Sequence, residues 1–404
     1  MKKIYKIRRF FRSFLKKKIR IVFVCHRPEV WESQKSIFNA CVKDKNFDVF
    51  LVTVPNKAQL PDLGLNHNVY RSEGAEEYFK NSPCTVINGY DYKDCSWFDL
   101  KKIKPDYVFF QQPYNICRPK QYWSKTVSKY ADICYISYGV TIFKGEVETS
   151  VHPTDFLKDC KLGFANFKFH QETLEKICSG LKKQPVFYSP GYTRFDNIKE
   201  YIKNGSHLWS FDRLQNITRI IWTPRWCTNE NTCTFFDYKD ILLKYIEERK
   251  DIDFIFRPHP QALSAWVAEG NMSKEEENDY IERYEKSKNA NLDRSKEYLS
   301  TFYSSDILIS DISSVMVDYF MTGKPIIYTH KTDLFNDFGK KIAEGFYWVR
   351  NWDDLKKTIE MLKSGNDPLK EKRREIIKSE FYIPEIGAGE TIKNIIKGDF
   401  YGKR

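Results

Sequence analysis

Short apolar runs alternate with helical segments along most of this 404-residue chain, and this alternation most constrains its fold. The runs at residues 21–25, 49–54, 107–110 and 133–136 are rich in β-branched and aromatic side chains, as strands are. Strands that alternate with helices form parallel sheets covered on both faces, because a parallel pair needs a long crossover connection. The sequence therefore predicts a doubly wound, Rossmann-like α/β domain over residues 20–196.

A second series of the same kind follows a polar stretch at residues 197–216, which has the composition of a linker. Its strand-like runs and helical patterns predict a second Rossmann-like domain over residues 217–380, followed by a helical segment at 381–404. The expected strands lie at residues 220–223, 254–257, 307–310 and 326–328, and the expected helices at 239–248, 278–287 and 315–321. Ligand sites of two such domains lie at the carboxyl ends of the strands, and we expect them to face a shared cleft.

The first 20 residues contain six Lys, four Arg and no acidic residue, so they supply +10 of the net charge of +12. Apolar side chains recur there at helical spacing, at Ile4, Ile7, Phe10, Phe11, Phe14 and Leu15. This pattern predicts a basic amphipathic helix over residues 1–19. One interpretation is that the helix is an in-plane anchor on an anionic membrane surface. The alternative is that the helix packs on the protein itself and its basic face is solvated. In both cases we expect its removal to leave the fold intact.

The remainder of the chain is nearly neutral, with 56 basic and 54 acidic residues. Together with the lack of any RNA-binding signature, this argues against a nucleic-acid partner. No apolar run approaches the roughly 20 residues needed to cross a bilayer. The ten cysteines show no CxxC or CxxH spacing, which is typical of reduced thiols in a cytoplasmic protein.

Several large enzyme classes lose their main sequence support. The chain has no GxGxxG, P-loop, HExxH or GxSxG motif, which argues against nicotinamide oxidoreductases, P-loop NTPases, zincins and α/β-hydrolases.

The expected strand at 254–257 ends in the sequence Arg257-Pro258-His259-Pro260. The two prolines stiffen the turn, so that a guanidinium and an imidazole would project from the strand end. Arg offers a planar fork of donors to phosphate oxygens, and His can donate to a phosphate or move a proton near neutral pH. An anion site is therefore predicted; the alternative is that Arg257 pairs with an acid and His259 caps a turn.

A second group of polar residues, Asp311, Ser313 and Ser314, follows the expected strand at 307–310, where a helix pattern begins. The hydroxyls and unpaired N–H groups of a first helical turn form a phosphate-binding nest. These residue types also serve as simple N-caps, which is the alternative. Asp318, one turn further on, would either support the nest or contact a hydroxyl of the ligand.

These motifs resemble the CDP-glycerol:polyol glycerophosphotransferase family, the teichoic-acid and capsule polymerases and primases. The resemblance is carried by residues 310–319 with the Gly-Lys-Pro-Ile-Ile-Tyr run at 323–328, and by the Arg257–Pro260 segment, which is similar to the family's Arg-x-His-Pro turn. The Gly-Tyr-Thr-Arg-Phe-Asp run at 191–196 is similar to its Gly-x-Pro-Arg-x-Asp turn. The Thr-Pro-Arg-Trp run at 223–226 matches its Pro-Thr-x-Arg segment in part.

The resemblance implies a GT-B fold, a CDP-activated polyol donor bound in the C-terminal domain, and phosphodiester formation with release of CMP. Four residues would then bind the donor pyrophosphate, supported by Asp311 and Asp318; they are Arg257, His259, Ser313 and Ser314. We expect catalysis by charge stabilisation of the leaving CMP, without a cofactor or an obligatory metal.

The proton acceptor is less clearly marked in the sequence. The family usually has a His-Gly pair after the strand that corresponds to 133–136, where this chain reads Ser137-Tyr138-Gly139. His152 lies in the polar loop 144–155 and has an ordinary pKa close to neutral, so we predict that it is the base. The alternatives are Tyr138, His26 and the acidic loop residues Glu146, Glu148 and Asp155.

We therefore expect a transferase that moves glycerol phosphate, or a related polyol phosphate, onto a cell-surface polysaccharide or a teichoic-acid-like or other lipid-linked acceptor. Its expected location is cytoplasmic, peripheral on the inner face of the cell membrane through residues 1–19. The alternative is a GT-B glycosyltransferase that uses a nucleotide sugar in capsule or lipooligosaccharide synthesis, since a fold does not determine its donor.

Overall fold

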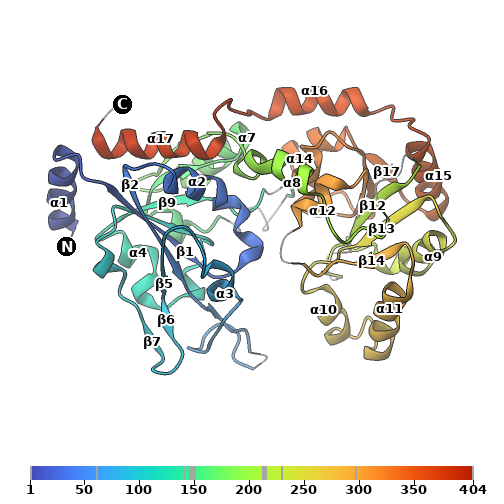
Figure 1. Cartoon of the computed structure of the whole chain (residues 1–404), viewed down its shortest axis with the longest axis horizontal. Coiled ribbons are helices and arrows are strands. Elements are labelled where there is room, and N and C mark those ends of the chain that lie inside the picture. The colour runs from blue at the N-terminus through green and yellow to red at the C-terminus, as the bar shows by residue number, and fades with distance from the viewer. Residues whose placement is uncertain are drawn as a thin grey trace. The chain divides into compact units, whose positions relative to one another are not determined.

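The structure is a computed structural model that describes residues 2–60, 62–140, 142–144, 152–211, 216–228, 231–295 and 298–402. The chain divides into two compact units (Figure 1). Unit 1 comprises Met1–Val140, Gly145–Asp196 and Glu380–Arg404, and unit 2 comprises Thr141–Lys144 and Asn197–Ser379. Each unit is built on one parallel sheet with helices on both faces, which confirms the predicted doubly wound α/β class.

The sheet of unit 1 is parallel throughout and contains the four strands that the sequence predicts, together with β5, β10 and β11, which it does not. Its order is β11 (Val186–Tyr188), β10 (Cys160–Phe164), β9 (Asp132–Ile136), β8 (Tyr107–Phe110), β1 (Ile19–Cys25), β2 (Phe47–Thr53) and β5 (Thr85–Asn88). The interior strand β1 is buried at all but one of its positions, because helices cover both sides of a parallel sheet. Phe23 on β1 stacks on Phe109 of β8, with ring centroids 5.2 Å apart.

Helices and two small antiparallel ribbons complete unit 1. The helices are α1 (Lys2–Phe14), η1 (Pro28–Val30), α2 (Glu32–Val42), α3 (Ala75–Phe79), η2 (Leu100–Ile103), η3 (Asn115–Cys117), η4 (Lys120–Tyr122), α4 (Ser124–Val127), α6 (Thr154–Leu157), α7 (Lys168–Cys178), η5 (Thr193–Asn197) and α17 (Ala388–Tyr401). The ribbons pair β3 (Asn56–Lys57) with β4 (Tyr70–Arg71), and β6 (Tyr90–Asp91) with β7 (Ser96–Trp97).

The sheet of unit 2 is also parallel throughout. Its order is β14 (Ala290–Leu292), β13 (Ile252–Phe256), β12 (Thr218–Thr223), β15 (Ile307–Ser310), β16 (Ile326–Thr329) and β17 (Tyr347–Val349). The covering helices are α8 (Ile198–Asn204), α9 (Phe235–Glu247), α10 (Ala262–Ala268), α11 (Lys274–Lys286), α12 (Leu299–Ser304), α13 (Val315–Phe320), α14 (Asp337–Ala343), α15 (Trp352–Lys363) and α16 (Lys370–Glu380).

The polar stretch at 197–216, expected to be a linker, packs on unit 2 over its described residues. It begins with α8, which lies against α12. Trp209 is buried and donates its indole N–H to Ser304 at 2.7 Å, and Ser206 hydrogen-bonds Thr301 at 3.0 Å. The polar composition of the stretch did not indicate that it packs on unit 2. Hydrogen bonds and one tryptophan hold it, and it has no apolar stripe of the kind that predicts a packed helix.

The Gly-Tyr-Thr-Arg-Phe-Asp run at 191–196 anchors the C-terminal helix α17 to unit 1. The Asp196 carboxylate accepts the backbone N–H groups of Ala388 and Gly389, at 2.9 and 2.8 Å, and the hydroxyl of Ser36 on α2. A carboxylate on the free N–H groups of a first helical turn stabilises the helix. The predicted helical segment 381–404 therefore includes a helix of unit 1, and Figure 1 shows α17 beside α2.

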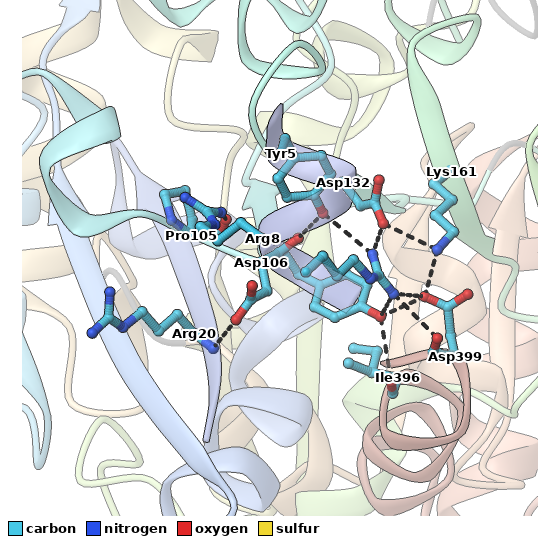
Figure 2. A network of polar contacts seen from close by, with 11 residues as sticks. Tyr5, Arg8, Arg20, Pro105, Asp106, Asp132, Lys161, Ile396 and Asp399 are labelled. Carbon is cyan, nitrogen blue, oxygen red and sulfur yellow. Dashed lines mark hydrogen bonds and ion pairs between the residues drawn. The ribbon is translucent and has the colours of Figure 1, made fainter. Parts of the chain in front are cut away.

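The N-terminal helix α1 packs on unit 1 through polar side chains (Figure 2). Arg9 is paired with Asp132 and Asp399, and Arg12 with the buried Asp106. Removing the helix would leave the buried Asp106 without its ion-pair partner and Asp132 and Asp399 with Lys161 alone, which argues against the expectation that the helix is separable from the fold. No helix of the described residues is long and apolar enough to cross a membrane.

Candidate functional site

The predicted donor site lies at the point where the strand order of unit 2 reverses. From β12 the chain continues on one side to β13 and β14, and then crosses to β15 and β16 on the other. The carboxyl ends of β12 and β15 are therefore adjacent, with Thr223 opposite Ser310 in the register. Open parallel sheets bind ligands at such a switch point, because the two loops diverge there and leave a crevice.

Asp311 is the residue that holds the two loops of this switch point together. Its buried carboxylate accepts the N–H of Arg225 at 2.6 Å with one oxygen. The other oxygen accepts the N–H of Thr234 at 2.8 Å and its hydroxyl at 3.2 Å. Asp311 thus joins the loop after β12 and the start of α9 to the end of β15. Its role as a support of a donor site stays a prediction, which this buried position between the loops favours.

Burial raises the pKa of Asp311 to about 7, although the hydrogen bonds from Thr234 and Arg225 oppose this effect. The loop connection therefore titrates close to neutral pH. The ordinary pKa of an Asp side chain is 3.8, so the pKa of Asp311 is unusually high for a carboxyl group that connects two loops.

Ser313 and Ser314 lie at the start of α13, as the sequence predicts. Ser314 is exposed, Ser313 is partly exposed, and within the described residues Ser314 makes no capping hydrogen bond through its side chain. The simple N-cap interpretation therefore does not account for this hydroxyl. A donor group next to the first N–H groups of a helix can hydrogen-bond an anion.

Arg257 follows β13 and is 12 % exposed. Its guanidinium donates to Asp293 at 2.6 Å, to the carbonyl of Ser295 at 3.0 Å and to the hydroxyl of Ser295 at 3.3 Å. This is the acid pair expected from the alternative interpretation. Because a guanidinium has five N–H donors, three hydrogen bonds leave donors that an anion can use.

Tyr298, which is not among the residues predicted from the sequence, connects Arg257 with Asp318. Its ring lies 5.2 Å from the Arg257 guanidinium carbon, and its hydroxyl donates to Asp318 at 2.7 Å. Asp318 is fully buried on α13, so its carboxylate contacts the protein here, and its role as a support of the donor site stays a prediction. Tyr298 has no motif around it; only its position before α12 and between the two predicted groups could have suggested a role.

His259 is exposed and stacks on Trp226, with ring centroids 5.9 Å apart. Its Nδ1 accepts the backbone N–H of Gln261 at 3.3 Å, which places the proton of the neutral ring on Nε2. The indole of Trp266 in turn donates to the carbonyl of Trp226 at 2.7 Å. The imidazole is therefore oriented by the loop after β12, the loop that Asp311 holds.

His152, predicted to be a proton acceptor in a polar loop, is instead buried in unit 1. It is 1 % exposed, its Nδ1 lies 2.8 Å from the hydroxyl of Tyr135, and its ring packs on His170. Burial lowers the pKa of His152 to about 4. The polar neighbours of His152 in sequence misled the interpretation, because the residue itself packs between β9 and α7. Its role as base stays a prediction that this position does not favour.

The alternative proton acceptors Asp155 and Tyr138 both take part in hydrogen bonds within unit 1. Asp155 is exposed and accepts a hydrogen bond from Asn115 at 2.9 Å. The hydroxyl of Tyr138 pairs with that of Tyr114 at 2.8 Å, and its carbonyl accepts from Arg194. Glu146 and Glu148 lie outside the described residues.

His26 lies at the switch point of the unit 1 sheet, between β1 and β8. The side chain of Gln111, which follows β8, accepts the N–H groups of His26 and Arg27 at 2.8 and 3.1 Å. The His26 Nε2 lies 3.8 Å from the carboxylate of Glu73. Burial lowers the pKa of His26 well below its ordinary value, so the ring is neutral at physiological pH.

Comparison with known proteins agrees with the motifs of unit 2. Residues 183–376 match the model of the CDP-glycerol:poly(glycerophosphate) glycerophosphotransferase family. The resemblance to this family is confirmed. The matched region contains every residue of the predicted donor site. The match also supports the predicted enzyme class, a transferase of the glycerophosphotransferase type. The chain has no significant sequence match among curated proteins.

Solved structures show the fold. The wall teichoic acid polymerase TagF has a TM-score of 0.59 and 14 % identity, with 100 % of this chain and 98 % of that chain covered. The UDP-GlcNAc 2-epimerase from Neisseria meningitidis has a TM-score of 0.56 and 14 % identity, covering 96 % of this chain and 100 % of that chain. Both are GT-B enzymes, so the predicted GT-B-like fold is confirmed, while identities this low say nothing of the donor.

Proposed function

We propose that this chain transfers glycerol phosphate from CDP-glycerol to a polymer acceptor of the cell surface and releases CMP. The observation that supports this most directly is the arrangement at the switch point of unit 2. There Arg257, His259 and the start of α13 are positioned by buried supports, Asp311 and Asp318, and all lie within the region that matches the family.

In the proposed reaction an acceptor hydroxyl attacks the phosphorus that carries glycerol, and the bond to the CMP oxygen breaks. Negative charge accumulates on the leaving phosphate, where Arg257 offers N–H donors and His259 an Nε2 proton. The hydroxyls of Ser313 and Ser314 and the N–H groups of α13 would bind the non-bridging oxygens of the pyrophosphate. Residues of unit 2 thus supply charge stabilisation, and the attacking hydroxyl gives its proton to a base.

We identify the acceptor by class as a polymer bearing free hydroxyls, either teichoic-acid-like or a capsular polysaccharide. We further propose a peripheral location on the cytoplasmic face of the cell membrane. The support is the basic N-terminal segment, since each Lys or Arg near an anionic surface contributes about 1 kcal/mol to binding. A reaction without metal or cofactor also stays a prediction, tested by activity in the presence of EDTA.

The function is tested by incubating the purified chain with CDP-glycerol or a second CDP-polyol, together with a glycerol-phosphate oligomer as acceptor. We expect acceptor-dependent release of CMP and growth of the acceptor by one glycerol phosphate per CMP. A parallel reaction with UDP-N-acetylglucosamine tests the alternative donor class. Turnover of the nucleotide sugar without turnover of any CDP-polyol would replace this proposal by the glycosyltransferase alternative.

A further inference from the structure

The helix α1 turns its arginines toward the protein. Arg8 donates to the carbonyl of Pro105 at 2.8 Å, and the buried Tyr5 donates to the carbonyl of Asp106 at 3.0 Å (Figure 2). Arg9 donates to Asp399 at 2.5 Å and pairs with Asp132. These contacts come from strands and loops of unit 1 and from α17, so the helix is held on several sides.

The Arg9 contacts form a nearly neutral cluster. Two carboxylates, Asp132 and Asp399, are shared by Arg9 and Lys161, with Lys161 at 3.0 and 2.7 Å from them. The guanidinium of Arg9 also lies 4.8 Å from the Tyr107 ring and is 12 % exposed. A cation held in this way cannot reach a lipid phosphate while the helix stays in place. We call this group, Arg9 with Asp132, Asp399, Lys161 and Tyr107, the Arg9 clamp.

The opposite side of α1 and the residue after it present large apolar side chains to solvent. Phe14 is 76 % exposed and Ile4 72 % exposed, so these apolar side chains lie in solvent and not in the core. The full set, here called the apolar face, is Ile4, Ile7, Phe10, Phe11, Phe14 and Leu15. A contiguous exposed face of this kind marks an interaction surface.

Exposed lysines accompany the apolar face, at Lys3, Lys6, Lys16 and Lys17, whereas the exposed Lys18 lies 3.5 Å from the carboxylate of Asp48. The first 20 residues contain no acid that could pair with them. A second copy of the chain docking on this face would bring like charges together, which is unfavourable. An anionic bilayer instead accepts apolar side chains at the acyl boundary and lysines at the headgroups.

We propose that α1 is a fixed insertion surface, in which the apolar face and its lysines contact an anionic bilayer while the Arg9 clamp holds the helix in that orientation. This deepens the membrane part of the proposed function and is independent of the transfer chemistry. It also differs from the expectation from sequence alone, since the arginines are part of the scaffold and only the lysines are available to lipid.

The test is binding of the full chain to vesicles of phosphatidylcholine with about 30 % phosphatidylglycerol, measured by sedimentation without substrate. The Phe10→Ser/Phe14→Ser variant should bind at least about tenfold more weakly and unfold at the same temperature, because both rings are solvent-exposed. Lys3→Gln/Lys6→Gln should also bind about tenfold more weakly. The control Arg374→Gln, an exposed change on α16, should bind as the wild type.

Three results would overturn the proposal. One is unchanged vesicle binding by the Phe10→Ser/Phe14→Ser variant, and another is a large loss of its thermal stability, which would mean that the apolar face packs on protein. The third is a concentration-dependent dimer that the same variant abolishes, which would assign the face to a second copy.

Arg9→Gln tests the Arg9 clamp. We expect this variant to bind vesicles more weakly than the wild type. Equal or tighter vesicle binding would contradict the clamp and would mean that α1 is attached flexibly. CMP release from CDP-glycerol, measured without vesicles, reports separately on the proposed function.

Discussion

The hydroxyl of Tyr298 donates a 2.7 Å hydrogen bond to the buried carboxylate of Asp318, and the ring of Tyr298 lies beside the guanidinium of Arg257. One side chain thus connects the loop after β13 with the helix that begins at the two serines. We regard Tyr298 as a positioning residue of the donor site, since it acts through Arg257 and α13.

Tyr298→Phe should therefore weaken use of the donor. The variant leaves Asp318 buried without this donor, which costs about 1–3 kcal/mol. We expect a lower thermal midpoint and a rise in the KM for CDP-glycerol of about tenfold, with a smaller change in kcat. Tyr382→Phe, at a residue that is 59 % exposed, is the matched control. An unchanged KM at full stability loss would show that the hydrogen bond serves the fold alone.

Stability should depend on pH through Asp311. Its pKa is raised to about 7 in the folded chain and has the ordinary value of 3.8 when unfolded. Between these values the folded state keeps a proton that the unfolded state has lost, so stability falls as pH rises from about 4 to about 7, by roughly 3–4 kcal/mol. Asp311→Asn should flatten this dependence in thermal unfolding measured across that range. Equal slopes for the two proteins would contradict the assignment.

The proton acceptor can be assigned by comparing two histidines. His152→Asn should lower the thermal midpoint, because it breaks the buried contact with Tyr135, and should leave turnover per folded molecule within about threefold. His26→Asn, at the switch point of unit 1, should lower kcat by about a hundredfold if His26 takes the proton. A large loss of kcat in His152→Asn at unchanged stability would instead support the base predicted from the sequence.

Asp196 should be important for the docking of α17. Its carboxylate accepts two N–H groups of the first turn of α17 and a hydroxyl on α2. Asp196→Ala should therefore lower the free energy of unfolding by about 1–3 kcal/mol and increase hydrogen exchange in α17. Asp94→Ala, at an exposed turn, provides the control. Unchanged exchange in α17 would mean that apolar contacts alone hold the helix.

The long strands of both sheets could be predicted because they are buried on both faces and read as continuous apolar runs. All five positions of β13 are buried, for example. Strands of three residues, such as β14 and β17, carry too little pattern to be separated from loops, and their position at or near the sheet edge decides their pairing.

Residues of the candidate donor site could be placed at strand ends from the sequence where they follow a strand directly, as Arg257 and Asp311 do. Tyr298 could not be placed in this way, because its partners lie 20 or more residues away and no local periodicity marks it. For His152 a local pattern was present but gave the wrong environment. The polar residues around it suggested a solvated loop, although its own side chain is in the core. In the same way, the inward orientation of Arg9 depends on Asp399, at the far end of the chain.

The most direct test of the account is acceptor-dependent CMP release from CDP-glycerol by the wild type and by Arg257→Lys. Lysine keeps the positive charge of Arg257 but cannot hold Asp293 and Ser295 and still offer donors to a pyrophosphate. We predict steady release by the wild type, with one glycerol phosphate added per CMP, and at least a tenfold lower rate for a folded Arg257→Lys variant. Equal rates for the two proteins, or no CMP release from any CDP-polyol, would contradict it.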